Sequence, residues 1–163
     1  FAFLAEMERL HMIVDVSHLS DKGFWDIVEH GTRPFAASHS NCRALAPHTR
    51  NLTDEMIRAL AERGGIAGLN YYAPFLDTDP THPERCRSTA ELIAKHAAHY
   101  KQVGGAQMIA LGSDFDGIDG PHQLENAAFL PLLADALRKE GFTEDEVEGV
   151  YHRNAMRFFE ENL

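Results

Sequence analysis

Short apolar segments alternate with longer segments of helical periodicity along the chain, and this alternation limits the possible folds more than any other feature. The apolar segments, residues 12–16, 34–38, 66–71 and 108–111, predict four buried strands. Helical spacing covers residues 2–10, 20–30, 53–63, 88–103 and 123–139, and continues from Thr143 to about Glu161. Short strands that alternate with helices are typical of a parallel sheet covered by helices. The sequence therefore predicts an α/β fold of about four strand–helix units.

Four strand–helix units are half of an eight-stranded β/α barrel, or most of a small open sheet. A complete barrel of this kind typically needs about 250 residues, whereas this chain has 163. The chain also begins with Phe1 rather than Met, inside a segment of helical spacing. We therefore expect residues 1–163 to be a single domain, the C-terminal half of a TIM-type (β/α)8 barrel whose N-terminal half is absent.

Residues that can cap helices mark where several of these helices begin. Ser20 and Thr53 precede helical segments, and their side-chain oxygens can accept hydrogen bonds from free backbone N–H groups. Capping boxes, in which Ser or Thr stands three residues before Glu, are expected at Ser88–Glu91 and Thr143–Glu146. The Pro- and Asp-rich residues 73–87 are expected to form a loop.

The charge and composition of the chain exclude two classes of partner. The 15 Lys and Arg residues against 25 Asp and Glu residues give a formal net charge of −10, and no basic cluster suited to nucleic acid is present. No apolar run approaches the ~20 residues of a membrane span, and no leader peptide is recognisable at Phe1. Two cysteines, Cys42 and Cys86, are too few for a disulfide framework and favour a reduced, cytoplasmic location.

Polar side chains follow three of the predicted strands, at the point where each strand ends. Ser17-His18 follows the first strand, His39 follows the second, and Asp114 follows the fourth. Active sites of parallel β/α folds lie at the carboxyl ends of the strands, so these side chains are expected at one mouth. Neutral imidazole is a common zinc ligand, and a nearby carboxylate can relay the proton of a bound water. The pattern predicts a metal site with His18 and His39 as ligands and Asp114 as the carboxylate.

Each candidate also has a structural interpretation. A single His after a strand is more often a buried, hydrogen-bonded loop anchor than a ligand, and two His with one Asp are too few for a dinuclear centre. Arg50, in a polar loop after the second strand, can hold a substrate carboxylate by two hydrogen bonds, or it can be a surface charge or helix-capping contact. His96 and His99, one turn apart on a helix, are expected to be a packed or partly exposed structural pair.

Four short motifs occur in a fixed order along the chain. They are Asp15-Val16-Ser17-His18-Leu19-Ser20, Ser38-His39-Ser40-Asn41 with Arg50-Asn51, Gly112-Ser113-Asp114-Phe115-Asp116-Gly117, and Asn154-Ala155-Met156-Arg157-Phe158. Together they resemble the motifs of the membrane (renal-type) dipeptidase family of zinc metallopeptidases. The resemblance runs over essentially all 163 residues, and four motifs in order make it fairly specific.

The resemblance implies an eight-stranded β/α barrel with two zinc ions bridged by a carboxylate and a water. By position, His18 and His39 would be the two His ligands of one zinc ion. Arg50 would hold the terminal carboxylate of the substrate, and Asp114 would bind substrate and handle the proton. The implied reaction is hydrolysis of the peptide bond of a dipeptide, often with tolerance for a D-residue at the second position.

The resemblance also implies residues that this chain lacks. The family's first-strand His-x-Asp pair, its bridging Glu and a further substrate-contacting His match no segment here, so the chain resembles strands five to eight.

Three hypotheses about the function of the chain follow. The chain is the C-terminal half of a dinuclear zinc dipeptidase, poor in zinc and inactive alone; or it belongs to another metal-dependent amidohydrolase of the same barrel; or it is a non-catalytic half-barrel. In the third case its open sheet edges would bury against an N-terminal half or a second copy in a homo-oligomer.

Overall fold

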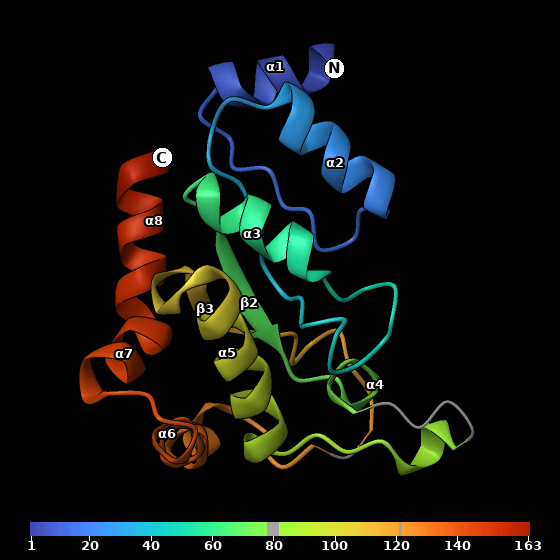
Figure 1. The fold of residues 1–163 in the computed structure, drawn as a ribbon, viewed down its shortest axis with the longest axis vertical. Helices are drawn as coiled ribbons and strands as arrows, with labels where there is room; N and C mark the ends of the chain where they lie inside the picture. The colour runs from blue at the N-terminus through green and yellow to red at the C-terminus, as the bar shows by residue number, and fades with distance from the viewer. Residues whose placement is uncertain (78–81, 121) are drawn as a thin grey trace.

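A small parallel sheet forms the centre of the computed structural model, which describes residues 1–77, 82–120 and 122–163 (Figure 1). Within the described residues the sheet has three strands, in the order β1 (Ala36–Ala37), β2 (Ile66–Asn70) and β3 (Ile109–Ser113). β1 pairs in parallel with β2, and β2 pairs in parallel with β3. These strands overlap three of the four predicted segments, and the parallel α/β class is confirmed.

The first predicted strand, residues 12–16, is not a regular strand, and that prediction is wrong. The segment makes one isolated parallel bridge, between Asp15 and Ala36. Two backbone hydrogen bonds hold it there: Val16 N–H donates to the Ala36 carbonyl at 2.8 Å, and Ala36 N–H donates to the Val14 carbonyl at 2.9 Å. Val14 and Val16 are buried and Asp15 is exposed, which is the period-two burial of a strand. The pairing is too short to form a ladder.

Helices surround the sheet. They are α1 (Ala2–Arg9), α2 (Asp21–His30), α3 (Asp54–Glu62), α4 (Ala73–Leu76), α5 (Ala90–Gly104), α6 (Leu130–Lys139), α7 (Glu144–Glu148) and α8 (Asn154–Asn162). Short 3-10 turns occupy Pro83–Arg85, Ala106–Met108 and Ala127–Phe129, and a π-helical turn, Gly149–Arg153, joins α7 to α8. Among the described residues, no helix has both the length and the apolar character that crossing a membrane requires.

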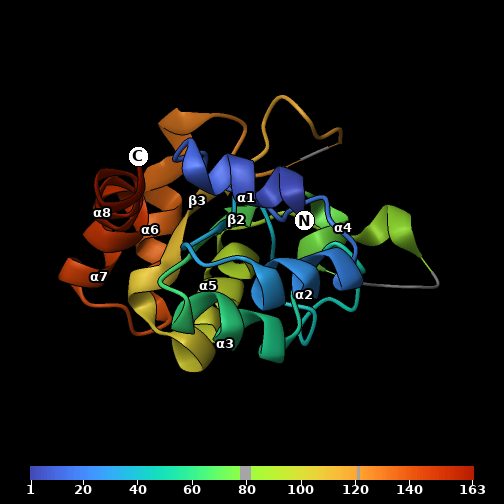
Figure 2. The same cartoon turned by 90° about the horizontal axis from the view of Figure 1, so that it is seen from above.

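The two faces of the sheet pack against different helices, because successive strand residues point to opposite faces. One face belongs to the main core and presents Ala37, Ala67 and Ile109. The other face presents Ala36, Ile66 and Ala110, which pack on Phe158 of α8. Figures 1 and 2 show α3 and α5 on one side of the strands and α8 on another. The sheet is therefore a layer between helices.

The observed helix starts confirm three predicted N-caps and correct one. The confirmed caps are Ser20, Thr53 and Thr143, the last with a complete capping box to Glu146. The capping box expected at Ser88–Glu91 is wrong. Thr89 caps α5 instead, by accepting a hydrogen bond from Leu92 N–H, and the Ser88 hydroxyl donates to the buried carbonyl of Tyr71 at 2.6 Å. Because the Tyr71 carbonyl, which is distant in sequence, binds the Ser88 hydroxyl, Thr89 rather than Ser88 caps the helix.

Two other boundaries differ from the prediction. The loop expected over residues 73–87 contains α4 and a 3-10 turn, and its residues 78–81 lie outside the described part of the chain. The helix expected from residue 123 begins later, because the side chain of Asn126 accepts from Ala128 N–H and starts a 3-10 turn that leads into α6.

Two glycines let the chain after β1 pass close over the neighbouring strands. A Cβ atom on Gly68 of β2 or Gly112 of β3 would collide with the carbonyl oxygen of Ser38. Backbone oxygen cannot move away as a side chain can, so both positions require glycine. This close approach packs the backbone of Ser38 against Gly68 of β2 and Gly112 of β3.

Candidate metal centre and substrate site

Two loops at the carboxyl ends of neighbouring sheet segments bring His18 and His39 together. His18 follows the bridged segment 12–16, and His39 follows β1. Their Nε2 atoms lie 2.9 Å apart and their ring centroids 4.9 Å apart. The backbone N–H of His39 donates to the hydroxyl of Ser17 at 3.0 Å, which ties one loop to the other. Both imidazoles therefore present the same ring nitrogen to a common point.

The environment of His39 favours its neutral form. Burial lowers the pKa of the imidazole below its ordinary value of 6.5, and the charge of Arg50 and the neighbouring His18 act in the same direction. The carboxylates of Asp114 and Asp15 oppose this effect without cancelling it. Since metal ions bind neutral imidazole, this environment suits a ligand.

Asp15 holds both histidine-bearing loops through one carboxylate. Its Oδ1 accepts from Ser17 N–H at 3.1 Å and from Ser38 N–H at 3.0 Å, and its Oδ2 accepts from the Ser38 hydroxyl at 2.5 Å. Partial burial of the carboxylate raises the pKa of Asp15, but the hydrogen bonds from Ser38 and Ser17 outweigh burial and hold the pKa below its ordinary value. Sequence reasoning missed Asp15 and Ser38 as site residues. The sequence signal that could have identified Asp15 is an acidic residue between two apolar residues of a predicted strand.

Asp114 occupies an unusual backbone position at the end of β3. Its φ of +71°, after a φ of +22° at Ser113, lies in the left-handed region that residues other than glycine rarely adopt. Such conformations are enriched at functional sites. Nδ2 of Asn70 donates to Oδ2 of Asp114 at 3.0 Å, and Oδ1 of Asn70 accepts from Tyr72 N–H at 2.7 Å. The Tyr72 bond fixes the orientation of this fully buried amide, so Asn70 presents a donor to Asp114.

Sequence reasoning also missed Asn70. Only its position at the carboxyl end of a strand, beside Asp114 in space, points to a role.

Arg50 carries a buried donor that has no partner among the described residues, its Nη1 atom. Its Nη2 lies 3.3 Å from Nε2 of His18, and its guanidinium carbon lies 5.4 Å from the ring centroid of Phe75. Burial lowers the pKa of the guanidinium below its ordinary range, against the opposing charges of Asp114 and Asp15. A buried unpaired donor is costly, so this atom is suited to bind an acceptor supplied by a ligand.

A cavity of about 230 Å³ joins three of the four predicted site residues. It is lined by His18, Arg50, Tyr72, Phe75, Asp114, Gly117, Ile118 and Asp119. His39 reaches the same place through its contact with His18. The arrangement therefore puts two imidazoles, a guanidinium and a carboxylate around one small space.

The donor set fits part of a zinc site. Across residues 1–77, 82–120 and 122–163, no group of three or more His, Cys, Asp or Glu side chains is arranged to hold a metal ion. His18 and His39 are two nitrogen donors, whereas a catalytic zinc site normally has three protein ligands. These two side chains can supply two of the ligands of such a site.

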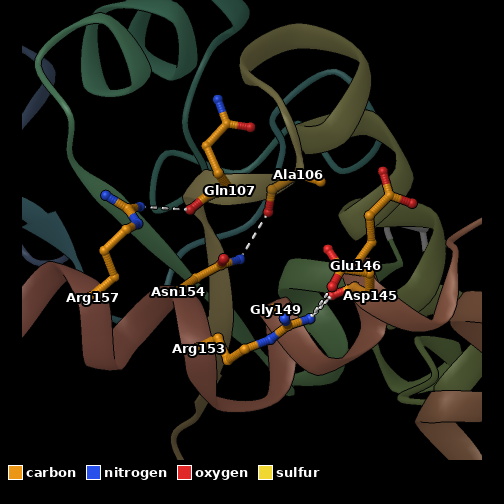
Figure 3. A pocket seen from close by; sticks show the side chains of 8 residues that line it. All are labelled: Ala106, Gln107, Asp145, Glu146, Gly149, Arg153, Asn154 and Arg157. Carbon is orange, nitrogen blue, oxygen red and sulfur yellow. Dashed lines mark hydrogen bonds and ion pairs between the residues drawn. The ribbon is translucent and has the colours of Figure 1, made fainter.

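A larger cavity, of about 460 Å³, lies away from these residues, at the other end of β3 (Figure 3). Several of its polar groups hold the start of β3 in place. Nδ2 of Asn154 donates to the carbonyls of Ala106 and Ile109 at 2.9 and 2.8 Å, and Nη2 of Arg157 donates to the Gln107 carbonyl at 3.1 Å. The C-terminal motif therefore holds the start of the strand that carries Asp114 at its far end.

His96 and His99 contribute to the fold. His96 is 1% exposed; its Nδ1 accepts from Cys42 N–H at 3.0 Å, and its Nε2 lies 3.1 Å from the Leu76 carbonyl. His99 lies 2.7 Å from the carboxylate of Asp54. The predicted structural pair is confirmed.

A parallel α/β sheet with imidazoles at the carboxyl ends of its strands has the arrangement of α/β enzymes, whose active sites lie at that edge of the sheet. The model of the membrane dipeptidase family (peptidase family M19) matches residues 2–162, and the chain belongs to this family. The family resemblance inferred from the four motifs is thus confirmed.

Three similar proteins illustrate the relationship. An uncharacterized protein of Klebsiella pneumoniae is 38% identical over 154 residues, which is 94% of this chain and 56% of that protein. The crystal structure of a metallopeptidase from Rhodobacter sphaeroides, liganded with a phosphinate mimic of the dipeptide L-Ala-D-Ala, is 33% identical with a TM-score of 0.89. The crystal structure of dipeptidase AC, a family M19 metallopeptidase, is 34% identical with a TM-score of 0.88.

The chain spans about half the length of these relatives. The match covers 99% of this chain in both solved structures, but only 46% of the Rhodobacter sphaeroides chain and 47% of dipeptidase AC.

Proposed function

We propose that residues 1–163 form a single domain, the C-terminal half of a (β/α)8 barrel, in a zinc-dependent enzyme that hydrolyses dipeptides. The observation that carries the proposal is the meeting of His18 and His39 beside Arg50 and Asp114 around one cavity. The match to about half of each related solved structure supports the half-barrel. One of those relatives binds a mimic of L-Ala-D-Ala, which supports dipeptides as the substrate class.

His18 and His39 would hold one of two zinc ions through their Nε2 atoms, and the remaining ligands would come from outside this chain. Bound zinc supplies a water whose pKa is lowered to about 7, which gives a nucleophile at neutral pH. The low pKa of His39 keeps its lone pair available for the metal at that pH.

Arg50 and Asp114 would act on the two ends of the substrate. The unpaired Nη1 of Arg50 is a buried donor, and a guanidinium binds a carboxylate by two hydrogen bonds, so Arg50 would hold the terminal carboxylate. Asp114, held by Asn70, would accept a proton and pass it toward the leaving amine. The cavity between them is small, in keeping with a dipeptide.

The isolated chain should bind less than one equivalent of zinc and show little or no dipeptidase activity, because two histidines rarely hold catalytic zinc. A partner N-terminal half or a second copy would complete the barrel. A cytoplasmic location, predicted from the two cysteines, remains part of the proposal.

Substitutions in the full-length protein that contains this segment test the assignment. His18→Ala and His39→Ala should each abolish zinc-dependent dipeptide hydrolysis, whereas His152→Ala, on an exposed helix surface, should not. Unchanged turnover in either of the first two variants would reject the metal site. Two tightly bound zinc ions in the isolated chain would reject the half-site.

Arg50→Ala separates a dipeptidase from another amidohydrolase of the same barrel. Loss of the carboxylate contact should raise KM for dipeptides while leaving an amide substrate without a terminal carboxylate much less affected. An unchanged KM for dipeptides would favour the other amidohydrolase.

A further inference from the structure

We propose that Asp15 and Ser38 are positioning residues that fix the tautomer of His39, with the proton on Nδ1 and the lone pair of Nε2 aimed at His18. The significance for zinc binding rests on the proposed function. The tautomer itself is a property of the metal-free chain and can be measured without zinc.

The proposal starts from the number of protons available at Asp15. Its carboxylate accepts three hydrogen bonds, two from backbone N–H groups and one from the Ser38 hydroxyl. An ionised carboxylate has no proton to donate. The short contact of 2.5 Å between Asp15 Oδ2 and Ser38 Oγ therefore contains the proton of Ser38.

The Ser38 hydroxyl then faces His39 with lone pairs only. Its oxygen lies 2.7 Å from Nδ1 of His39, which is hydrogen-bonding distance. Because the only proton of Ser38 is engaged by Asp15, the proton of this second bond must belong to His39 Nδ1. Neutral imidazole carries one proton, so Nε2 of His39 is left as an acceptor.

The contact between the two imidazoles agrees with this assignment. Nε2 of His39 and Nε2 of His18 are 2.9 Å apart, so one of them donates in the metal-free chain. With His39 as acceptor, His18 donates from Nε2. Arg50 Nη2 lies 3.3 Å from the same His18 atom and can donate only to a lone pair there, so in this assignment the His18 Nε2–H bond to His39 forms in place of a hydrogen bond from Arg50.

The chain of hydrogen bonds from Asp15 through Ser38 to His39, called the relay from here on, also explains why a carboxylate stands at position 15. An amide there would keep an oxygen for the two backbone N–H groups of Ser17 and Ser38, but its nitrogen would replace Oδ2. That nitrogen would donate to the Ser38 hydroxyl, which would in turn donate to Nδ1 of His39. Asp15→Asn should therefore reverse both hydrogen bonds and move the His39 proton to Nε2 while the loops stay in place.

Nitrogen NMR of the metal-free, ¹⁵N-labelled 163-residue chain, above the pKa of its histidines, measures the tautomer directly. The His39 signals are assigned with His39→Gln. We expect a protonated Nδ1 and an unprotonated Nε2 in the parent chain, and the reverse in Asp15→Asn. Ser38→Ala, which keeps the Asp15 charge, should give a mixture of both tautomers because Nδ1 loses its acceptor.

Matched controls isolate the relay from general effects of these substitutions. Ser40→Ala removes a hydroxyl that is buried without a hydrogen-bond partner among the described residues. Asp135→Asn removes one carboxylate from α6, where it pairs with Arg138. Neither should change the His39 tautomer. Backbone amide spectra show whether each variant keeps the fold.

Zinc titration followed by the same His39 signals supplies a second readout. Groups that orient a metal ligand typically contribute about 10–100-fold in metal affinity. Asp15→Asn and Ser38→Ala should both weaken zinc binding by about this factor relative to the parent chain, and the two controls should not. The loss in Ser38→Ala cannot arise from a change in net charge.

The outcomes separate this inference from the proposed function. A parent chain with His39 protonated on Nε2, or an Asp15→Asn chain with an unchanged tautomer, overturns the relay. If the tautomers change as expected but zinc moves the His39 signals equally in the parent chain and in His18→Ala, the relay stands and the shared metal site is wrong.

Discussion

Buried His96 should make the stability of this fold depend on pH between about pH 6.5 and 4. Both ring nitrogens have a partner in the neutral form: Nδ1 accepts from Cys42 N–H, and Nε2–H donates to the Leu76 carbonyl. A second proton would have to sit on Nδ1, where it would break the Cys42 bond and place a charge in the core. Folding therefore selects the neutral ring.

The size of the effect follows from the pKa of His96. Burial lowers it from 6.5 to about 4, with a smaller contribution from His99 in the same direction and an opposing one from the Leu76 hydrogen bond. The gap corresponds to about 3 kcal/mol of unfolding free energy. Above pH 6.5 the ring is neutral in both states. As the pH falls toward 4 only the unfolded chain takes up the proton, so the free energy of unfolding decreases; below that pH both states are protonated and the loss is complete.

Urea unfolding at a series of pH values from about 7.5 to 4, followed by circular dichroism and by the fluorescence of Trp25, measures this dependence. Variant His96→Gln should be less stable than the parent at neutral pH but should lose about 3 kcal/mol less on acidification. Variant His152→Gln, which removes an exposed His, should keep the parent's pH dependence. Equal pH slopes for His96→Gln and the parent would refute the reasoning.

Three further substitutions test other parts of the structure. Tyr71→Phe removes a buried hydroxyl that has no partner among the described residues, so urea unfolding should show unchanged stability or a gain of up to about 1 kcal/mol; a loss above that size would mean that the hydroxyl is hydrogen-bonded. Asn154→Ala leaves the carbonyls of Ala106 and Ile109 without their donor and should cost about 1–3 kcal/mol in the same assay. Asn70→Ala in the full-length protein should lower kcat for dipeptides more than it raises KM, because Asp114 loses the donor that orients it; an unaltered kcat would contradict that role.

The hydrophobic pattern was sufficient for most of the fold because most elements bury a local, periodic face. It identified β2 and the amphipathic helices, whose buried residues are set by their own spacing. It failed for residues 12–16, where the alternation is real but the length of pairing is set by a two-residue partner, β1. It failed again at Ser88, whose hydroxyl is taken by the carbonyl of Tyr71 from a distant strand end. Neither competition is visible in a local window.

The residues of the candidate site also fall into those that the sequence identified and those that only the fold brings to the site. His18, His39 and Asp114 could be named from the sequence because each follows a predicted strand, and Arg50 because a guanidinium in a polar loop can hold a carboxylate. Their roles as ligands and substrate contacts remain predictions. The residues that orient them could not be named, because a hydrogen bond from Asn70 to Asp114, or from Ser38 to Asp15, joins segments whose distance only the fold determines.

The shortness of β1 gives Asp15 its importance. A long ladder would hold the loops that carry His18 and His39 by many backbone hydrogen bonds, but here the pairing at this edge of the sheet ends almost at once. One carboxylate replaces the missing ladder by binding the backbone of both loops and the hydroxyl of Ser38. The spacing of the two imidazoles is therefore fixed by contacts within this chain, so that under the proposed function the two His ligands would be in position before an ion binds.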